Sequence, residues 1–177
     1  MLPEVLEHLQ VRPNGSYIDC TVGGGGHSEA ILEASKPNGR VLGLDADPIA
    51  LKLSADALSR FENRILLREC SFDNALTVAS DAGFQSVDGV ICDLGVSSFQ
   101  LDTPERGFSF NTHGPLDMRF GPSSELTAED IVNNFSEREI AKILFENSDE
   151  RRSRQIARRI VEHRPLFSTL ELAKAVE

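Results

Sequence analysis

Aromatic residues and long apolar runs are scarce in this sequence of 177 residues. Tryptophan is absent, tyrosine occurs once, and ten phenylalanines supply nearly all of the aromatic packing. No apolar stretch approaches the roughly 20 residues that a membrane-spanning helix needs. Residues 1–4 do not place a basic region before an apolar run, as a signal peptide would. We therefore expect neither a membrane span nor a signal peptide.

Cysteine is also rare. The three cysteines are Cys20, Cys70 and Cys92, and none belongs to a Cys-x-x-Cys motif. Their spacings match no zinc site, and the histidines are not spaced as ligands either, so we expect no bound metal. Two of the cysteines lie in apolar runs, where buried free thiols are expected. Free thiols in turn favour a cytoplasmic location.

Basic residues are fewer than acidic residues in the whole chain but are concentrated in one segment. The net charge of −10 argues against a protein that coats nucleic acid generally. Residues 149–164 nevertheless contain six arginines against three acids, a local surplus of +3. Such a run is either a solvated helix face or a stripe that faces an anion. The sequence leaves both readings open.

A run of four glycines is the most informative motif that is present. Residues 23–26 are all glycine, they follow the apolar run 17–22, and a helix-like segment follows them. A glycine turn between a strand and a helix lets the backbone approach a ligand where helix N–H groups are free. Asp45 ends the next apolar run, 20 positions after Gly25, a spacing suited to a carboxylate that binds a ribose diol. We infer a cofactor that contains a nucleoside.

The glycine pattern narrows the choice of cofactor. In a dinucleotide fingerprint starting at Gly23 or Gly24, the third glycine would fall on Ser28 or Glu29, so NAD and FAD are disfavoured. No Lys-Ser or Lys-Thr follows the glycines, which excludes a Walker-type phosphate loop. S-adenosylmethionine carries an adenosine without a phosphate and needs only the turn and the acid. A glycine loop that merely joins two elements is the alternative.

The order of the elements predicts an α/β fold. Strands are expected at residues 17–22, 40–45, 65–69 and 87–94, with helices at 27–35, 48–60 and 73–82 between them. Strands separated by helices of this length form a parallel, doubly wound sheet, whose ligands lie beyond the carboxyl ends of the strands. Asp93 lies at such an end. Only four strands can be recognised, so we expect a partial sheet. One flank of the fourth strand would then be unpaired, which predicts low stability or self-association of the chain.

The second part of the sequence has a different character. Residues 95–124 are rich in Gly and Pro and show no period, and a connection of this length is usually functional. The remainder is helical, with capping boxes expected at residues 136–139 and 168–171. We place the domain boundary between residues 105 and 106, giving a core of residues 1–105 and a loop with a helical domain at 106–177.

Several separated motifs together resemble the MraW/RsmH-type methyltransferases of small-subunit ribosomal RNA. Two are specific, Asp93-Leu94-Gly95-Val96-Ser97-Ser98 and Gly114-Pro115-Leu116-Asp117-Met118-Arg119, and the others are residues 19–28, 44–48, 88–102 and 105–110. The resemblance implies transfer of a methyl group from S-adenosylmethionine to the N4 amine of a cytidine. It also implies a Rossmann-like methyltransferase core with a helical inserted domain.

The resemblance also assigns site residues. The implied cofactor contacts are Gly25, Gly26, His27, Asp45, Phe72, Asp93 and Gln100. Asp93 is also the candidate catalytic acceptor for the cytosine amine. We expect RNA, as ribosomal RNA or the ribosomal subunit, to contact Arg106, Arg119, Arg151, Arg154 and Arg158. Family members extend further, with strands and His-Pro-Ala-Thr-like and Ser-Phe-His-Ser-like segments that this sequence lacks, so we expect a C-terminally truncated chain with little or no turnover. A non-catalytic cofactor- or RNA-binding fragment of such an enzyme is the alternative.

Overall fold

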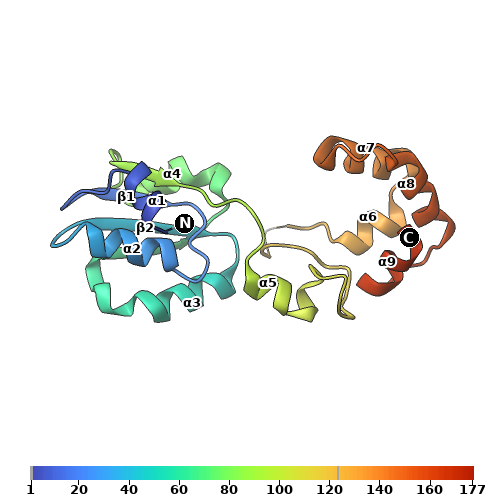
Figure 1. Cartoon of the computed structure of the whole chain (residues 1–177), viewed down its shortest axis with the longest axis horizontal. Coiled ribbons are helices and arrows are strands. Elements are labelled where there is room, and N and C mark those ends of the chain that lie inside the picture. Colours follow the sequence, from blue (N-terminus) through green and yellow to red (C-terminus); the bar gives the residue numbers. More distant parts are fainter. Residues whose placement is uncertain (1, 123) are drawn as a thin grey trace. The chain divides into compact units, whose positions relative to one another are not determined.

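The computed structural model describes residues 2–122 and 124–177. The chain divides into two compact units, residues 1–95 and 96–177, and Figure 1 draws both. This division falls before the predicted boundary at residue 105, because the short helix α5 (Ser98–Asp102) and the turn η3 (Pro104–Arg106) belong to the second unit.

The first unit is an α/β domain around a four-stranded parallel sheet. Its strands are β1 (Ser16–Asp19), β2 (Arg40–Asp45), β3 (Ile65–Glu69) and β4 (Gly89–Ile91), in the order β3-β2-β1-β4. The helices and turns are α1 (Leu2–His8), α2 (Gly26–Ala34), α3 (Pro48–Leu58), η1 (Ser59–Arg64), η2 (Phe72–Asn74) and α4 (Ala75–Asp81). The predicted mixed α/β fold is confirmed.

Alternating side chains of the strands build a core on each face of the sheet. Tyr17 and Val41 pack on one face with α2 and α3 residues such as Ile31 and Leu58, while Ile18 and Leu42 pack on the other face near α4. Figure 1 shows α2 and α3 on the side opposite α4. Full burial of side chains of this size stabilises a fold by roughly 1.5–3 kcal/mol each. Layers on both faces are the arrangement expected for a parallel sheet.

The fourth strand is shorter than predicted. We expected a strand over residues 87–94, but β4 covers only Gly89–Ile91. Beyond it the backbone leaves the ladder, because the Asp93 N–H donates to the Thr21 hydroxyl (2.8 Å) instead of a neighbouring strand. Among the described strands β4 pairs only with β1, so one flank is open, as predicted, and Val90 is 53% exposed. Self-association through this edge stays a prediction.

The second unit is helical. Besides α5 and η3 it contains α6 (Ala128–Asn134), α7 (Glu137–Ser148), α8 (Ser153–Glu162) and α9 (Thr169–Val176). Its core gathers Leu116 of the loop with Val132, Ile140 and Ile160 of the helices. The loop is attached to α9, since the Thr169 N–H donates to the Gly114 carbonyl (3.0 Å) and the Thr169 hydroxyl to the Thr112 carbonyl (2.7 Å).

One of the two predicted capping boxes is complete. Ser136 and Glu139 exchange both bonds at the start of α7. At α9 the Ser168 hydroxyl accepts the Glu171 N–H (3.3 Å), but the Glu171 carboxylate accepts the N–H of Phe167 instead of that of Ser168. The second prediction was therefore right about the cap and wrong about the reciprocal bond.

Candidate functional site

The glycine turn joins β1 to α2 at the carboxyl edge of the sheet. Gly23 and Gly25 have positive φ angles of 52° and 90°, which other residues adopt only at a cost. A Cβ at Gly25 would also lie 3.1 Å from the Leu58 side chain. A Cβ at Gly24 or Gly26 would meet nothing within 4 Å. The turn thus needs glycine for its shape at two positions and leaves open space above the other two.

Asp45 links the turn to the end of the neighbouring strand. Its Oδ2 accepts the Gly23 N–H and its Oδ1 accepts the Asp47 N–H, both at 2.9 Å. Each carboxylate oxygen can accept more than one hydrogen bond, so the side chain retains acceptor capacity for hydroxyl groups. The residue is partly exposed at the edge where the sequence placed it. Its role toward a ribose stays a prediction.

Asp19 is a residue of the site that the sequence reasoning missed. It ends β1 and is fully buried, and it accepts the Ser28 hydroxyl (2.7 Å) and the Thr21 N–H (3.1 Å). Burial raises the pKa of Asp19, and the two hydrogen bonds oppose that rise. A lone acid inside the apolar run 17–22 was the available signal. Asp19 thus binds one residue on each side of the glycine turn: Thr21 before it and Ser28 in the first turn of α2.

Asp19→Asn is expected to change how stability depends on pH. Because the folded-state pKa is raised, the contribution of Asp19 to stability is present below its unfolded pKa of about 4 and is lost as pH rises through the folded value. The free energy of unfolding of Asp19→Asn relative to wild type should therefore increase from pH 4 to pH 7. Urea unfolding across that range measures it, and a constant difference would contradict the assignment.

His27 and Asp93 approach each other at the same edge. His27 is in the first turn of α2, and its Nδ1 lies 3.9 Å from Asp93 Oδ2. The Asp93 side chain is 60% exposed, and its backbone is fixed by the bond to Thr21. A carboxylate that is exposed while its backbone is fixed can accept a hydrogen bond from a ligand amine.

Phe72 follows the end of β3. It opens η2 and is 55% exposed, so it is not an ordinary core residue. The four parallel strands thus present the predicted residues at one edge: the glycine turn after β1, Asp45 at the end of β2, Phe72 after β3 and Asp93 after β4. The first unit therefore brings six of the predicted cofactor residues to this edge: residues 25–27, Asp45, Phe72 and Asp93.

The other predicted cofactor residue, Gln100, belongs to the second unit. It is 5% exposed in α5, where its side-chain oxygen accepts the Ser97 N–H (3.0 Å) and its own N–H donates to the Ser97 hydroxyl (3.2 Å). This capping box begins α5. A contact with cofactor stays a prediction.

The arginines predicted to contact RNA fall into two groups. In the first group, Arg106 donates to the carbonyls of Arg119 and Phe120 (both 3.0 Å). Arg119 binds the Asp117 carboxylate through two nitrogens (2.9 and 2.7 Å). These two guanidinium groups hold the loop together. Arg154 and Arg158 lie on α8 and Arg151 lies just before it. All three are exposed, and Arg158 donates to Glu162 (2.9 Å).

Arg164 does not belong to an anion-facing stripe. Its guanidinium donates to the carbonyls of Val132 and Phe135 at the end of α6. Arg159 likewise donates to the Ala175 carbonyl (2.9 Å). Two of the six arginines counted in residues 149–164, Arg159 and Arg164, therefore bind backbone carbonyls of the protein itself.

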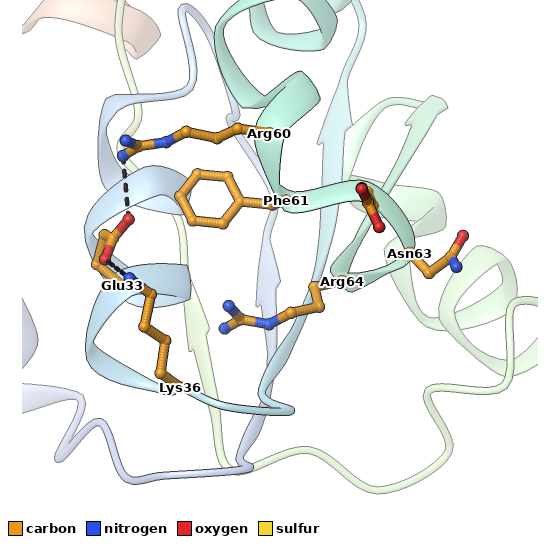
Figure 2. A pocket seen from close by; sticks show the side chains of 7 residues that line it. Glu33, Lys36, Arg60, Phe61, Asn63 and Arg64 are labelled. Carbon is orange, nitrogen blue, oxygen red and sulfur yellow. Dashed lines mark ion pairs between the residues drawn. The ribbon is translucent and has the colours of Figure 1, made fainter.

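A hollow of about 490 Å³ lies elsewhere in the first unit. Its walls come from the end of α2 and from η1, which precedes β3, so it lies at the amino edge of the sheet, away from the glycine turn. Figure 2 shows Glu33 paired with both Arg60 (3.1 Å) and Lys36 (2.5 Å). We do not assign a ligand to it, because its three cations have partners within the protein: Lys36 and Arg60 pair with Glu33, and Arg64 donates to the carbonyls of Leu32 and Gly39.

Among residues 2–122 and 124–177 there is no group of three His, Cys, Asp or Glu side chains that could hold a metal ion. Cys20 is buried, as predicted, but Cys92 is exposed, because β4 ends at Ile91 just before it. Burial raises the pKa of the Cys20 thiol to about 11, so this thiol is not a nucleophile at neutral pH. No helix in the described part of the chain is long and apolar enough to cross a membrane.

A family model described as the MraW methylase family matches residues 1–177. A curated "Ribosomal RNA small subunit methyltransferase H" from Dehalococcoides mccartyi is 48% identical over 177 residues, which is 100% of this chain and 51% of that protein. A protein of the same name from Carboxydothermus hydrogenoformans is 48% identical and covered to 57% of its length, with 99% of this chain aligned. The chain spans about half the length of the curated relatives it matches.

The comparison with solved structures adds little. A crystal structure of a putative rRNA-methylase from Clostridium thermocellum aligns with 42% of this chain and 44% of its own, at 22% identity and a TM-score of 0.39. A score of this size carries no argument about the fold, which therefore stands on the strand order and pairing given above.

Proposed function

The chain belongs to the MraW methylase family, and on that premise we propose that it binds S-adenosylmethionine and serves the methylation of the N4 amine of a cytidine in small-subunit ribosomal RNA. The observation that carries the proposal is the joining of the glycine turn to Asp45 through the Gly23 N–H, at the carboxyl edge of a parallel sheet. This edge is where doubly wound sheets bind nucleoside cofactors. The names of the relatives supply the RNA substrate.

The residues at this edge fit the cofactor. The space above Gly24 and Gly26 admits a ligand close to the backbone, and Asp45 retains acceptor capacity for two ribose hydroxyls. Phe72 offers an exposed ring on which an adenine can stack. The same edge has neither the third glycine of a dinucleotide fingerprint nor the lysine of a phosphate loop.

Asp93 is the best candidate to act on the substrate. When bound, S-adenosylmethionine supplies a methyl group on a sulfonium centre with a good leaving group. The lone pair of a cytosine N4 amine is conjugated into its ring, which makes the amine a poor nucleophile. A carboxylate that accepts a hydrogen bond from the N4–H would localise this lone pair and accept the proton that leaves after transfer. Asp93 is exposed enough to do so, and His27 near it can hold the carboxylate in place.

We also propose a binding partner and a cellular location for the protein. The partner is the small ribosomal subunit or its RNA, and the protein works in the cytoplasm, where that subunit is assembled and used. The target cytosine must reach the site unpaired or flipped out, because its N4 amine lies within the base pair of a helix.

A methyl-transfer assay tests the proposal. The chain, radiolabelled S-adenosylmethionine and unmethylated small ribosomal subunits are incubated, and the RNA is digested to nucleosides. We expect a low level of label in N4-methylcytidine, and none when Asp93→Ala replaces the wild type. Label-free RNA together with measurable cofactor binding would show that the chain binds without turning over, and labelling of another atom would refute the proposed reaction.

A further inference from the structure

Three phenylalanines and a methionine are displayed by the loop of the second unit. Phe110 is 70% exposed, Met118 45% and Phe120 44%, and Phe108 is partly buried. The rings of Phe108 and Phe120 lie 5.2 Å apart between centroids, with their planes inclined by 43°. Between residues 106 and 120 Leu116 is buried, and the exposed apolar residues besides the phenylalanines are Pro115 and Met118. We call Phe108, Phe110, Met118 and Phe120 the aromatic platform.

The backbone under the platform is held in a fixed shape. The Met118 N–H donates to the Arg106 carbonyl (3.0 Å), and the Arg106 guanidinium returns to the carbonyls of Arg119 and Phe120. Gly107 has a φ of 72°, and a Cβ there would lie 2.2 Å from the Pro115 carbonyl oxygen. Met118 itself has a φ of 58°, which strains a residue other than glycine. The rings are therefore presented by a constrained loop and not left exposed by a loose one.

The charge of this segment differs from that of the chain. Residues 106–120 contain two arginines and one aspartate, a net of +1, in a protein whose net charge is −10. Exposed rings combined with positive charge are the elements by which proteins hold single-stranded nucleic acid, since every base has a face that can stack. An aliphatic patch would instead favour another protein as partner.

We propose that the aromatic platform stacks an unpaired nucleobase of the RNA substrate, and that Phe110 and Phe120 make the stacking contacts. This inference rests on the proposed function for the identity of the RNA. It adds a base-holding surface on the second unit that is separate from the phosphate contacts expected of α8. Stacking of this kind tolerates any base, so the platform holds the strand and does not select its sequence.

Single-stranded RNA binding tests the platform without depending on methyl transfer. The probe is a short fluorescein-labelled RNA with the sequence around a cytidine, titrated with the whole chain and followed by anisotropy. Loss of one stacked base corresponds to about 5- to 150-fold in affinity. We expect a loss in this range for Phe110→Ala and for Phe120→Ala, and near wild-type affinity for Phe110→Tyr, which keeps a ring.

Phe145→Ala is the matched control, because Phe145 is a 55% exposed phenylalanine on α7 outside the loop. Affinity equal to wild type in Phe110→Ala and Phe120→Ala, or an equal loss in Phe145→Ala, overturns the inference. Self-association that only the platform variants abolish, seen by sedimentation, also overturns it, because the rings would then bind a second copy. If Phe110→Ala and Phe120→Ala transfer methyl groups as well as the wild type, the platform alone is refuted. If these variants lose RNA affinity but the wild type transfers no methyl group, only the proposed reaction is refuted.

Discussion

Asp45→Ala is expected to weaken the binding of S-adenosylmethionine about 10- to 150-fold. The substitution removes a charged acceptor from a ribose diol, which corresponds to about 1.5–3 kcal/mol for a hydrogen bond to a charged group. Isothermal calorimetry of the purified variant measures it. An unchanged dissociation constant would contradict the assignment of Asp45.

The structure adds a second effect that the experiment must separate. Asp45 also accepts the N–H groups of Gly23 in the turn and of Asp47 before α3, so Asp45→Ala leaves both amides without their acceptor. Asp45→Asn keeps one neutral acceptor and should show a smaller loss of affinity. Thermal melts identify any loss of fold. Asp56→Ala, which removes an exposed acid of α3, is the control and should bind like wild type.

Gly26→Val gives an independent means of blocking the site. A Cβ at Gly26 meets nothing within 4 Å, so the variant should fold, yet its side chain would occupy the space that the cofactor needs. Gly25→Val is less informative, because the positive φ and the Leu58 contact would disturb the turn itself. Binding by Gly26→Val as tight as that of the wild type would place the cofactor elsewhere.

Neutralising Arg151, Arg154 and Arg158 together is expected to flatten the salt dependence of RNA binding by up to about three units of slope. Each phosphate contact releases counterions, so each lost contact lowers the slope of log K against log salt by about 0.7–0.9. Because Arg158 is paired with Glu162, Arg151 and Arg154 should account for most of the change. Cofactor affinity should not change.

Binding isotherms at several salt concentrations decide this prediction. The pair Arg151→Gln with Arg154→Gln is compared with Arg138→Gln and Lys142→Gln, which remove the same charge from α7. We expect a reduced slope only for the Arg151 and Arg154 pair. An unaltered slope in the triple variant would mean that α8 is a solvated face, the alternative that the sequence left open.

Much of the first unit could be predicted from the sequence because its signals are local. The glycine turn, the apolar runs and Asp45 at the end of the second one predicted a parallel sheet and the edge where the candidate site lies. β2 and β3 begin and end where they were expected, at Arg40–Asp45 and Ile65–Glu69. Such features depend on residues close together in the chain, which a pattern can capture.

The features that could not be predicted depend on distant contacts. The early end of β4 follows from the Asp93 bond to Thr21, 72 positions away. Arg106 and Arg164 were counted as positive charge, but each donates to carbonyls of a segment remote in sequence. The role of Asp19 depends on its bonds to Thr21 and Ser28, and the only signal in the sequence was a lone acid inside the apolar run 17–22.

The most direct test of the account is a calorimetric titration of the wild-type chain with S-adenosylmethionine, alongside an identical titration with NADH. We expect saturable binding of one S-adenosylmethionine per chain, since the carboxyl edge of the sheet provides an acceptor for a ribose and open space above glycines but no pyrophosphate fingerprint. We expect no measurable binding of NADH. Binding of NADH, or no heat with S-adenosylmethionine from a folded chain, would contradict it.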